Sequence, residues 1–144
     1  MHIKQVSVFL ENKSGRLAEV TSILGSNDID ITALTIADTA EFGILRLIVD
    51  KPDKAVEVLR KHNFSVDITE VIAIRVDNKP GGLSVALNHL QDNNIGIEYM
   101  YSYLGNTGDG KAIIIIRVED TQSTVKILKD NGIDIVSADE IYNI

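Results

Sequence analysis

The sequence contains no cysteine, so disulfides, thiolate catalysis and cysteine-based metal sites are excluded. It has 2 prolines and no low-complexity tract, so no flexible linker is expected. No apolar run approaches the roughly 20 residues of a membrane span, and the N-terminus lacks the apolar core of a signal peptide. These absences, with the missing cysteines, predict a cytoplasmic protein.

Positive charge is also scarce. The formal net charge is −7 and the sequence pI is about 4.8. A polyanion would be repelled by this net negative charge, and no cluster of Lys and Arg creates a positive region to offset it. Nucleic acids and anionic membranes are therefore not expected as partners. Hydrophobic residues make up 44% of the chain, enough to fill a globular core.

Residues suited to catalysis or metal binding are sparse. The histidines, His2, His62 and His89, lie far apart and share no helical pair spacing. No serine, histidine and acid form a recognisable nucleophile motif. We therefore expect no catalytic residue, no metal and no cofactor.

The chain contains an internal repeat. The segment Asn12–Leu17 (NKSGRL) recurs as Asn78–Leu83 (NKPGGL), an offset of 66 (78 − 12). Towards the C-terminus the offset becomes 69, as where Val49 corresponds to Val118 (118 − 49). A register held over most of both halves indicates duplication, with three residues added in the glycine-rich segment 104–110.

Each copy has the pattern of a β-α-β-β-α-β unit, which is the ferredoxin-like arrangement. Strands are indicated by alternating or β-branched apolar runs, and helices by apolar residues at helical spacing. The second helix of each copy should stop at Asn63 or Gly132, two residue types that accept left-handed backbone. In copy one the strands are expected at 5–10, 31–37, 44–49 and from 66 onward, and the helices from Leu17 to Asn27 and from Pro52 to Asn63.

The two copies overlap, which leaves no residues for a linker. The last strand of copy one (66–74) runs into the first strand of copy two (71–76), so one long strand or a sharply joined pair is expected. The predicted fold is α+β, with two tandem units at residues 1–70 and 71–144. Each would be an antiparallel sheet with its helices on one side.

The runs V-F-L-E-N-K-S-G-R-L-A-E-V (8–20) and N-D-I-D-I-T-A-L (27–34) resemble the ACT domain. So do I-R-V-D-N-K-P-G-G-L (74–83) and N-N-I-G-I-E-Y-M (93–100). The units are similar to regulatory modules of acetolactate synthase small subunits, aspartate kinases and phosphoglycerate dehydrogenases. The resemblance implies paired units that bind amino acids at their interface, while any chemistry belongs to another domain or subunit.

The loop before each first helix is the first part of the candidate ligand site. Gly15 and Gly81 leave backbone N–H groups open at a helix N-terminus, where a carboxylate is favoured. Asn12 and Asn78 can offer an amide donor and acceptor. The competing interpretation is a tight turn in which the Asn holds its own backbone. The full set of expected loop residues is Asn12, Ser14, Gly15, Leu17, Asn78, Gly81, Gly82 and Leu83.

The segment that begins the second strand is the other half of the site that the resemblance implies. It comprises Asp30 and Ile31 in copy one and Gly96 and Ile97 in copy two. Neither Asp30 nor Gly96 is the Asn of serine-binding relatives. Asp30 also has the simpler interpretation of a solvated loop acid. These departures predict two sites that are not equivalent.

Aromatic residues gather on one predicted strand of copy two. Because alternate residues share a face, Tyr99, Tyr101 and Tyr103 should lie together on the sheet side without helices. We expect this side to form the interface of a homodimer or larger assembly, although copy one could cover it within the chain. The expected interface residues are Tyr99, Tyr101, Tyr103, Ile113 and Ile115.

Three functions remain open from the sequence. The first is a non-catalytic regulatory protein that binds an amino acid and acts on an enzyme partner. The second is an assembly scaffold whose ligand sites are vestigial. The third, less favoured, is an acylphosphatase-like enzyme that uses Arg16. Gly82 stands at the corresponding position of copy two, which weighs against this third function.

Overall fold

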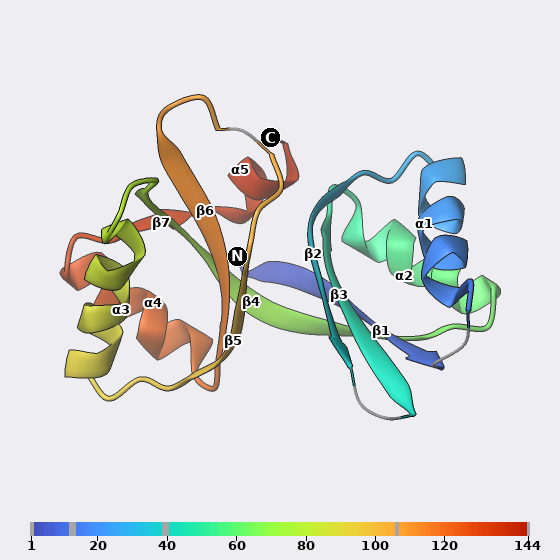
Figure 1. The fold of residues 1–144 in the computed structure, drawn as a ribbon, viewed down its shortest axis with the longest axis horizontal. Coiled ribbons are helices and arrows are strands. Elements are labelled where there is room, and N and C mark those ends of the chain that lie inside the picture. Colours follow the sequence, from blue (N-terminus) through green and yellow to red (C-terminus); the bar gives the residue numbers. More distant parts are fainter. Residues whose placement is uncertain (1, 12–13, 39–40, 106, 144) are drawn as a thin grey trace. The chain divides into compact units, whose positions relative to one another are not determined.

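The computed structural model describes residues 2–11, 14–38, 41–105 and 107–143. Figure 1 shows the elements in chain order. The strands are β1 (Ile3–Glu11), β2 (Ile31–Asp38), β3 (Phe42–Val49), β4 (Ser65–Asp77), β5 (Ile97–Ser102), β6 (Lys111–Val118) and β7 (Asp134–Val136). The helices are α1 (Arg16–Ser26), α2 (Pro52–Lys61), α3 (Gly82–Asp92), α4 (Thr121–Asp130) and α5 (Ala138–Tyr142).

The chain divides into two compact units. One is Lys4–Thr69, and the other is Glu70–Ile144 with Met1–Ile3. The strand β4 is continuous and contributes residues to both units, which is the long shared strand expected from the overlap of the repeats. The observed division differs from 1–70 and 71–144 at Glu70 and at the N-terminus, where His2 and Ile3 line a pocket together with Val71 and Ile72.

Both units have the ferredoxin-like strand order. The first runs β2-β3-β1-β4, and the second runs β7-β4-β6-β5. The strands of the pairs β1–β3, β2–β3, β4–β6, β4–β7 and β5–β6 are antiparallel. This is the α+β fold predicted from the repeat.

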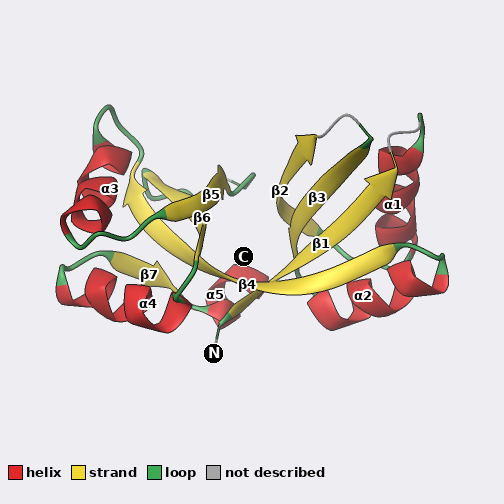
Figure 2. Ribbon diagram, turned by 90° about the horizontal axis from the view of Figure 1, so that it is seen from below, coloured by secondary structure: helices red, strands yellow, loops and turns green. Residues whose placement is uncertain are grey.

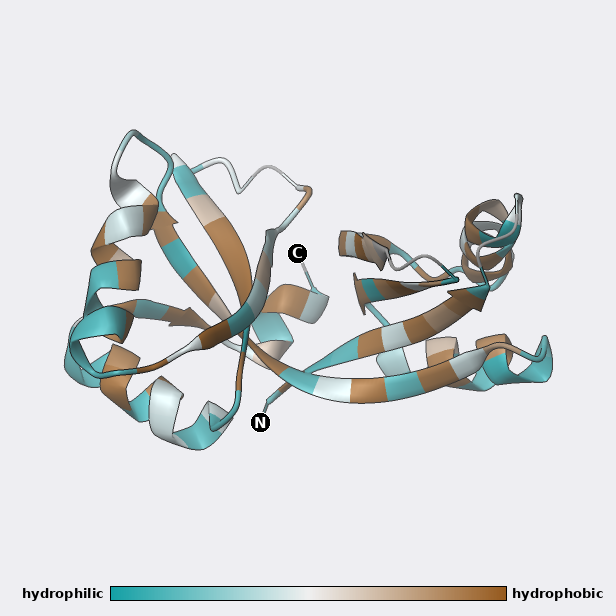
Figure 3. Ribbon diagram, turned by 60° about the horizontal axis from the view of Figure 1, so that its bottom comes forward, coloured by the Kyte–Doolittle hydropathy of each residue, from teal (hydrophilic) through white to brown (hydrophobic). Residues whose placement is uncertain are grey.

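The core of each unit lies between one sheet face and its two long helices. In the first unit, Val6, Val8 and Leu10 of β1 pack with buried residues of α1 and α2. In the second, Ile72 and Ile74 of β4 pack with buried residues of α3 and α4. Figure 2 shows α3 and α4 on one side of their sheet, and Figure 3 shows the alternating hydrophobic and hydrophilic bands along the strands. Each fully buried aliphatic side chain contributes about 1.5–3 kcal/mol to this packing.

The strands of the second unit carry a second apolar set that alternates with the core residues. Tyr101, Ile113 and Ile115 are buried, whereas Tyr99 and Tyr103 are half-buried. Tyr103 follows the end of β5, and its backbone N–H donates to the carbonyl of Ile113 at 2.9 Å. The role of this set in an assembly stays a prediction.

The short helix α5 was not expected from the sequence. Ser137 is its N-cap, and the Ser137 hydroxyl accepts a hydrogen bond from the Glu140 backbone N–H at 3.1 Å. The spacing Ser-x-x-Glu is a helix-start signal that could have revealed it. Arg75 of β4 reaches the Glu140 carboxylate at 3.2 Å, so α5 is tied to the sheet.

The backbone explains where the helices start and stop. Gly15 and Gly81 have φ of 89° and 84°, and Asn63 and Gly132 have φ of 68° and 75°, so both copies use left-handed residues at these points. The first helix ends at its C-cap, Asn27, as expected. The φ of Asn27 is −104° and its side chain donates to the Ile23 carbonyl, while Asp28 takes the left-handed conformation at φ 57°.

Candidate functional site

The glycine loop of copy two joins β4 to α3. The Asn78 backbone N–H donates to the Gly110 carbonyl and the Gly82 N–H donates to the Lys79 carbonyl, both at 3.0 Å. Two backbone N–H groups of this loop are therefore already hydrogen-bonded within the fold. No side chain caps the N-terminus of α3, where Gly81 is the N-cap. The positive end of the helix dipole is left open to an anionic ligand group.

A pocket of about 410 Å³ lies against this loop. Small-molecule sites in proteins usually have volumes of roughly 300–1,000 Å³, so it can hold a metabolite. It is lined by Arg75, Val76, Asp77, Lys79, Pro80, Gly81, Gly82, Val85, Ala86, Lys111, Gly132, Ile133 and Asp134.

The pocket lining carries both signs of charge. The Asp77 carboxylate pairs with the Lys111 ammonium, its partner across β4 and β6, and lies 3.8 Å from the Lys79 ammonium. Arg75 lies 3.4 Å from the Asp134 carboxylate, its partner across β4 and β7. Three cationic and two anionic groups therefore surround one cavity.

These pairings shift the proton affinities of the groups. The hydrogen bond from Lys111, with the charges of Lys111 and Lys79, lowers the pKa of the Asp77 carboxyl. The same hydrogen bond raises the pKa of Lys111. Burial lowers the pKa of Arg75, but Glu140 and Asp134 outweigh it and raise that pKa overall. All three groups are charged at neutral pH.

Copy one has a pocket at the matching place, with a volume of about 480 Å³. Its lining corresponds one for one with residues of the copy-two pocket at the repeat offsets of 66 and 69. The cross-strand pairs agree, since Glu11 faces Phe42 as Asp77 faces Lys111. Its lining residues, each followed by the copy-two counterpart, are Phe9 (Arg75), Glu11 (Asp77), Arg16 (Gly82), Phe42 (Lys111), Asn63 (Gly132), Phe64 (Ile133) and Ser65 (Asp134).

The segments that begin the second strand lie elsewhere. Gly96 and Ile97 line a separate pocket of about 380 Å³, together with Glu98, Glu119 and Asp120. In copy one, Asp30 is exposed, and its backbone N–H donates to the Asp50 carboxylate at 2.9 Å. Within one copy, the glycine loop and this segment therefore do not meet in one pocket.

Lysines occupy the second-strand region of copy one. Lys54 donates to the Asn27 carbonyl at 2.7 Å, and Lys51 donates to the Asp28 carbonyl. At the offset of 69 the counterparts are Ser123 and Asp120, and Asp120 caps α4 instead. The two copies therefore differ in charge in this region.

The remaining predicted site residues differ in how far they are exposed to solvent. Asn12 lies outside the described residues. Ser14, Gly15 and Asn78 are exposed, and Leu17 is 40% exposed. The other three apolar residues are half-buried and pack against the cores: Ile31 in the first unit, and Leu83 and Ile97 in the second.

Sequence reasoning missed the charged and aromatic residues that line the two loop pockets. Arg75, Lys111 and Asp134 lie on three different strands, and only the sheet register brings them together. An alignment of the two repeats could have drawn attention to these positions, because Phe9 and Phe42 stand where copy two has Arg75 and Lys111.

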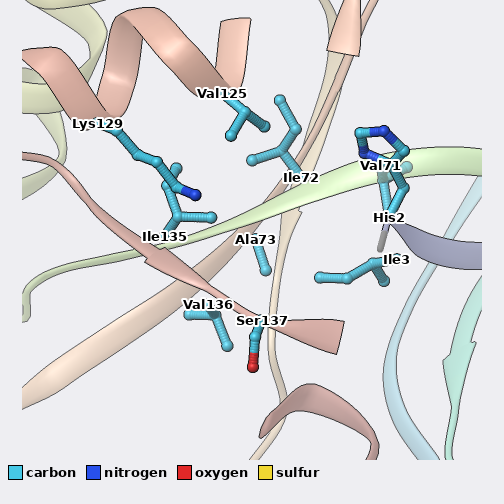
Figure 4. A pocket seen from close by; sticks show the side chains of 10 residues that line it. All are labelled: His2, Ile3, Val71, Ile72, Ala73, Val125, Lys129, Ile135, Val136 and Ser137. Carbon is cyan, nitrogen blue, oxygen red and sulfur yellow. The ribbon is translucent and has the colours of Figure 1, made fainter. Parts of the chain in front are cut away.

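A further pocket of about 230 Å³ lies on the second unit, away from the glycine loop. Figure 4 shows Val125 and Lys129 of α4 on one side of it and His2 and Ile3 on another. Its floor is apolar, with Ile72, Ala73 and Val136 among its lining residues. This pocket was not expected from the sequence.

Within the residues that the structure describes, no group of three or more His, Cys, Asp and Glu side chains could hold a metal ion. None of the helices in residues 2–11, 14–38, 41–105 and 107–143 combines the length and apolarity needed to cross a membrane.

The family model described as "ACT domain pair" matches residues 1–144. A crystal structure of a protein from Bacteroides thetaiotaomicron is 43% identical, with a TM-score of 0.92, and the match covers 100% of this chain and 98% of that one. The regulatory subunit of aspartate kinase from Thermus thermophilus has a TM-score of 0.61 at 13% identity, over 90% and 91% of the two chains. Its counterpart from Thermus flavus has a TM-score of 0.59 at 12% identity, over 90% and 92%. The two Thermus structures show a shared fold. No curated protein matches the sequence significantly.

Proposed function

Because the chain belongs to the ACT domain pair family, we propose that it is a non-catalytic regulatory protein that binds a free amino acid. The ligand binds at the glycine-loop pocket of copy two, and the bound state alters the activity of an enzyme partner. The fold shared with the regulatory subunits of aspartate kinase supports a role that is separate from catalysis.

The observation that carries this proposal is the mixed charge around the loop pocket. A free amino acid has a carboxylate and an ammonium a few ångströms apart. Arg75, Lys79 and the open N-terminus of α3 suit the carboxylate, while Asp77 and Asp134 suit the ammonium.

The ion pair between Lys79 and Asp77 does not prevent this binding. Lys79 is 69% exposed and Asp77 is 47% exposed. Exposed ion pairs contribute only about 0–1 kcal/mol, so a ligand can exchange partners with them at small cost. A Kd between micromolar and millimolar, or about −8 to −4 kcal/mol, suits a sensor of metabolite levels.

Within copy two, Gly81 and Gly96 line separate pockets, and the proposed ligand binds at the pocket of Gly81. A part for the second-strand residues Asp30 and Gly96 in ligand binding stays a prediction.

A thermal-shift screen against the twenty amino acids tests the proposal. A ligand at 100 times its Kd should stabilise the protein by about 2.7 kcal/mol. Calorimetry with that ligand should then show binding roughly threefold to tenfold weaker in Lys79→Glu, because an attractive charge becomes repulsive.

Lys126→Glu is the matched control. Lys126 is 82% exposed on α4 and pairs with Asp130 at 3.7 Å, away from the pocket lining. Its affinity should equal that of the wild type. If none of the twenty amino acids stabilises the protein, the assembly scaffold becomes the better account.

A further inference from the structure

The loop pocket of copy one differs in chemistry from its duplicate. The chain has 3 phenylalanines, and all of them, Phe9, Phe42 and Phe64, line this pocket. Their counterparts in copy two are Arg75, Lys111 and Ile133. The two copies of the pocket therefore differ, with an aromatic lining in copy one and a charged lining in copy two.

Two of these rings are partly open to solvent, whereas Phe64 is buried. Phe9 is 42% exposed and Phe42 is 52% exposed. Single exposed apolar residues are common on protein surfaces, but aromatic rings gathered around one cavity form a patch suited to binding. Covering them with an apolar ligand removes that surface from water.

The same pocket offers one cation and one anion. The Arg16 guanidinium lies 5.7 Å from the centre of the Phe64 ring, and its Nη1 donates to the Glu19 carboxylate at 3.1 Å. Arginine has five N–H donors in a planar fork, which suits a carboxylate. The pair with Glu19 is exposed and weak, so a ligand carboxylate can compete for the guanidinium. Glu11 supplies the negative charge.

We infer that the copy-one pocket binds an amino acid with an aromatic side chain. The ring lies among the phenylalanines, the carboxylate binds Arg16, and the ammonium faces Glu11. The volume of about 480 Å³ is ample for such a ligand. The inference rests on the proposed function and extends it, because the two copies then bind different amino acids, with the aromatic one in copy one.

L-tryptophan is a direct probe, because the chain has no tryptophan of its own. Its indole emission then comes only from the ligand. The fluorescence anisotropy of a fixed amount of L-tryptophan should rise and saturate as the full-length protein is added. 3-Indolepropionate, which lacks the ammonium, should compete better than tryptamine, which lacks the carboxylate that Arg16 binds.

Variants locate the site. Phe42→Ala and Arg16→Gln should each weaken L-tryptophan binding by about tenfold, through loss of ring contact and of the carboxylate partner. Ile68→Ala is the matched control, since Ile68 is 39% exposed in the same unit and does not line the pocket. It should bind as the wild type does. Thermal melting of each variant verifies its fold.

The outcomes separate this inference from the proposed function. No saturable anisotropy change, or wild-type binding by both Phe42→Ala and Arg16→Gln, would overturn the aromatic site. A change in sedimentation of Phe42→Ala with unchanged L-tryptophan binding would also overturn it, and would assign the rings to a subunit contact. An amino acid that binds in a Lys79-dependent way would meanwhile leave the proposed function standing.

Discussion

At Gly82 the backbone leaves no room for a side chain. A Cβ placed there would lie 1.9 Å from the carbonyl oxygen of Asp77. The counterpart in copy one is Arg16, so this close approach belongs to copy two alone. Gly81 differs from Gly82, because its φ of 84° needs glycine while a Cβ would meet nothing closer than the Ser84 hydroxyl at 4.0 Å.

Gly82→Ala should therefore destabilise the protein by about 1–3 kcal/mol, as overpacking against backbone does. The higher helix propensity of alanine, worth about 1 kcal/mol, does not offset that clash. Urea unfolding measures the difference. Gly96→Ala is the control, because Gly96 has open space around it, and it should unfold as the wild type does. Equal stability of Gly82→Ala and the wild type would show that the loop shifts freely.

The carboxyl of Asp77 provides a residue-scale test of the charged pocket. Its pKa is lowered in the folded protein, chiefly by the Lys111 hydrogen bond. A depressed carboxyl pKa adds stability that is present above the unfolded value of about 3.9. It is lost as the pH falls through the folded value.

Lys111→Met should return the Asp77 pKa towards its ordinary value, with a smaller depression left by Lys79. An NMR pH titration of the Asp77 carboxyl carbon measures this change. Below about pH 4, the free energy of unfolding should also fall less steeply with decreasing pH than it does in the wild type. The prediction is wrong if the Asp77 midpoint is the same in both proteins.

Among the elements, α5 is held by one N-cap and two contacts with the rest of its unit. Its five residues are too few for a stable isolated helix. The Ser137 cap, the buried Ile141 and the ion pair between Arg75 and Glu140 hold it in place. Asp120 caps α4 in the same way, through its bond to the Ser123 N–H at 3.1 Å.

Ser137→Ala should lower the free energy of unfolding by about 1 kcal/mol, the usual cost of a lost N-cap. Ser26→Ala, in the last turn of α1, removes a hydroxyl that caps no helix and should change stability little. Both are measured by urea denaturation. Equal effects from the two substitutions would mean that the Ser137 hydroxyl contributes nothing as a cap.

For the whole molecule, the homo-oligomer stays a prediction. Of the five residues assigned to the interface, Tyr101, Ile113 and Ile115 are buried within the chain. Sedimentation velocity at micromolar concentration should give a mass of at least twice the 15.8 kDa of one chain. A single 15.8 kDa species at every concentration would contradict the assembly.

The sequence by itself determined the architecture, because the evidence for it is local and repeated. Apolar periodicity, the left-handed residues Gly15, Gly81, Asn63 and Gly132, and Pro52 at the first turn of α2 each act through neighbouring backbone. It missed α5, since a five-residue helix has no periodicity to detect.

Only the tertiary structure decided what lines the loop pockets. Arg75, Lys111 and Asp134 come from β4, β6 and β7, and their side chains meet because antiparallel register sets them side by side. Phe9, Phe42 and Phe64 are likewise far apart in the sequence and share one cavity. A repeat identifies equivalent positions along the chain. It does not show which of them face the same cavity, because that depends on strand pairing over long distances in sequence.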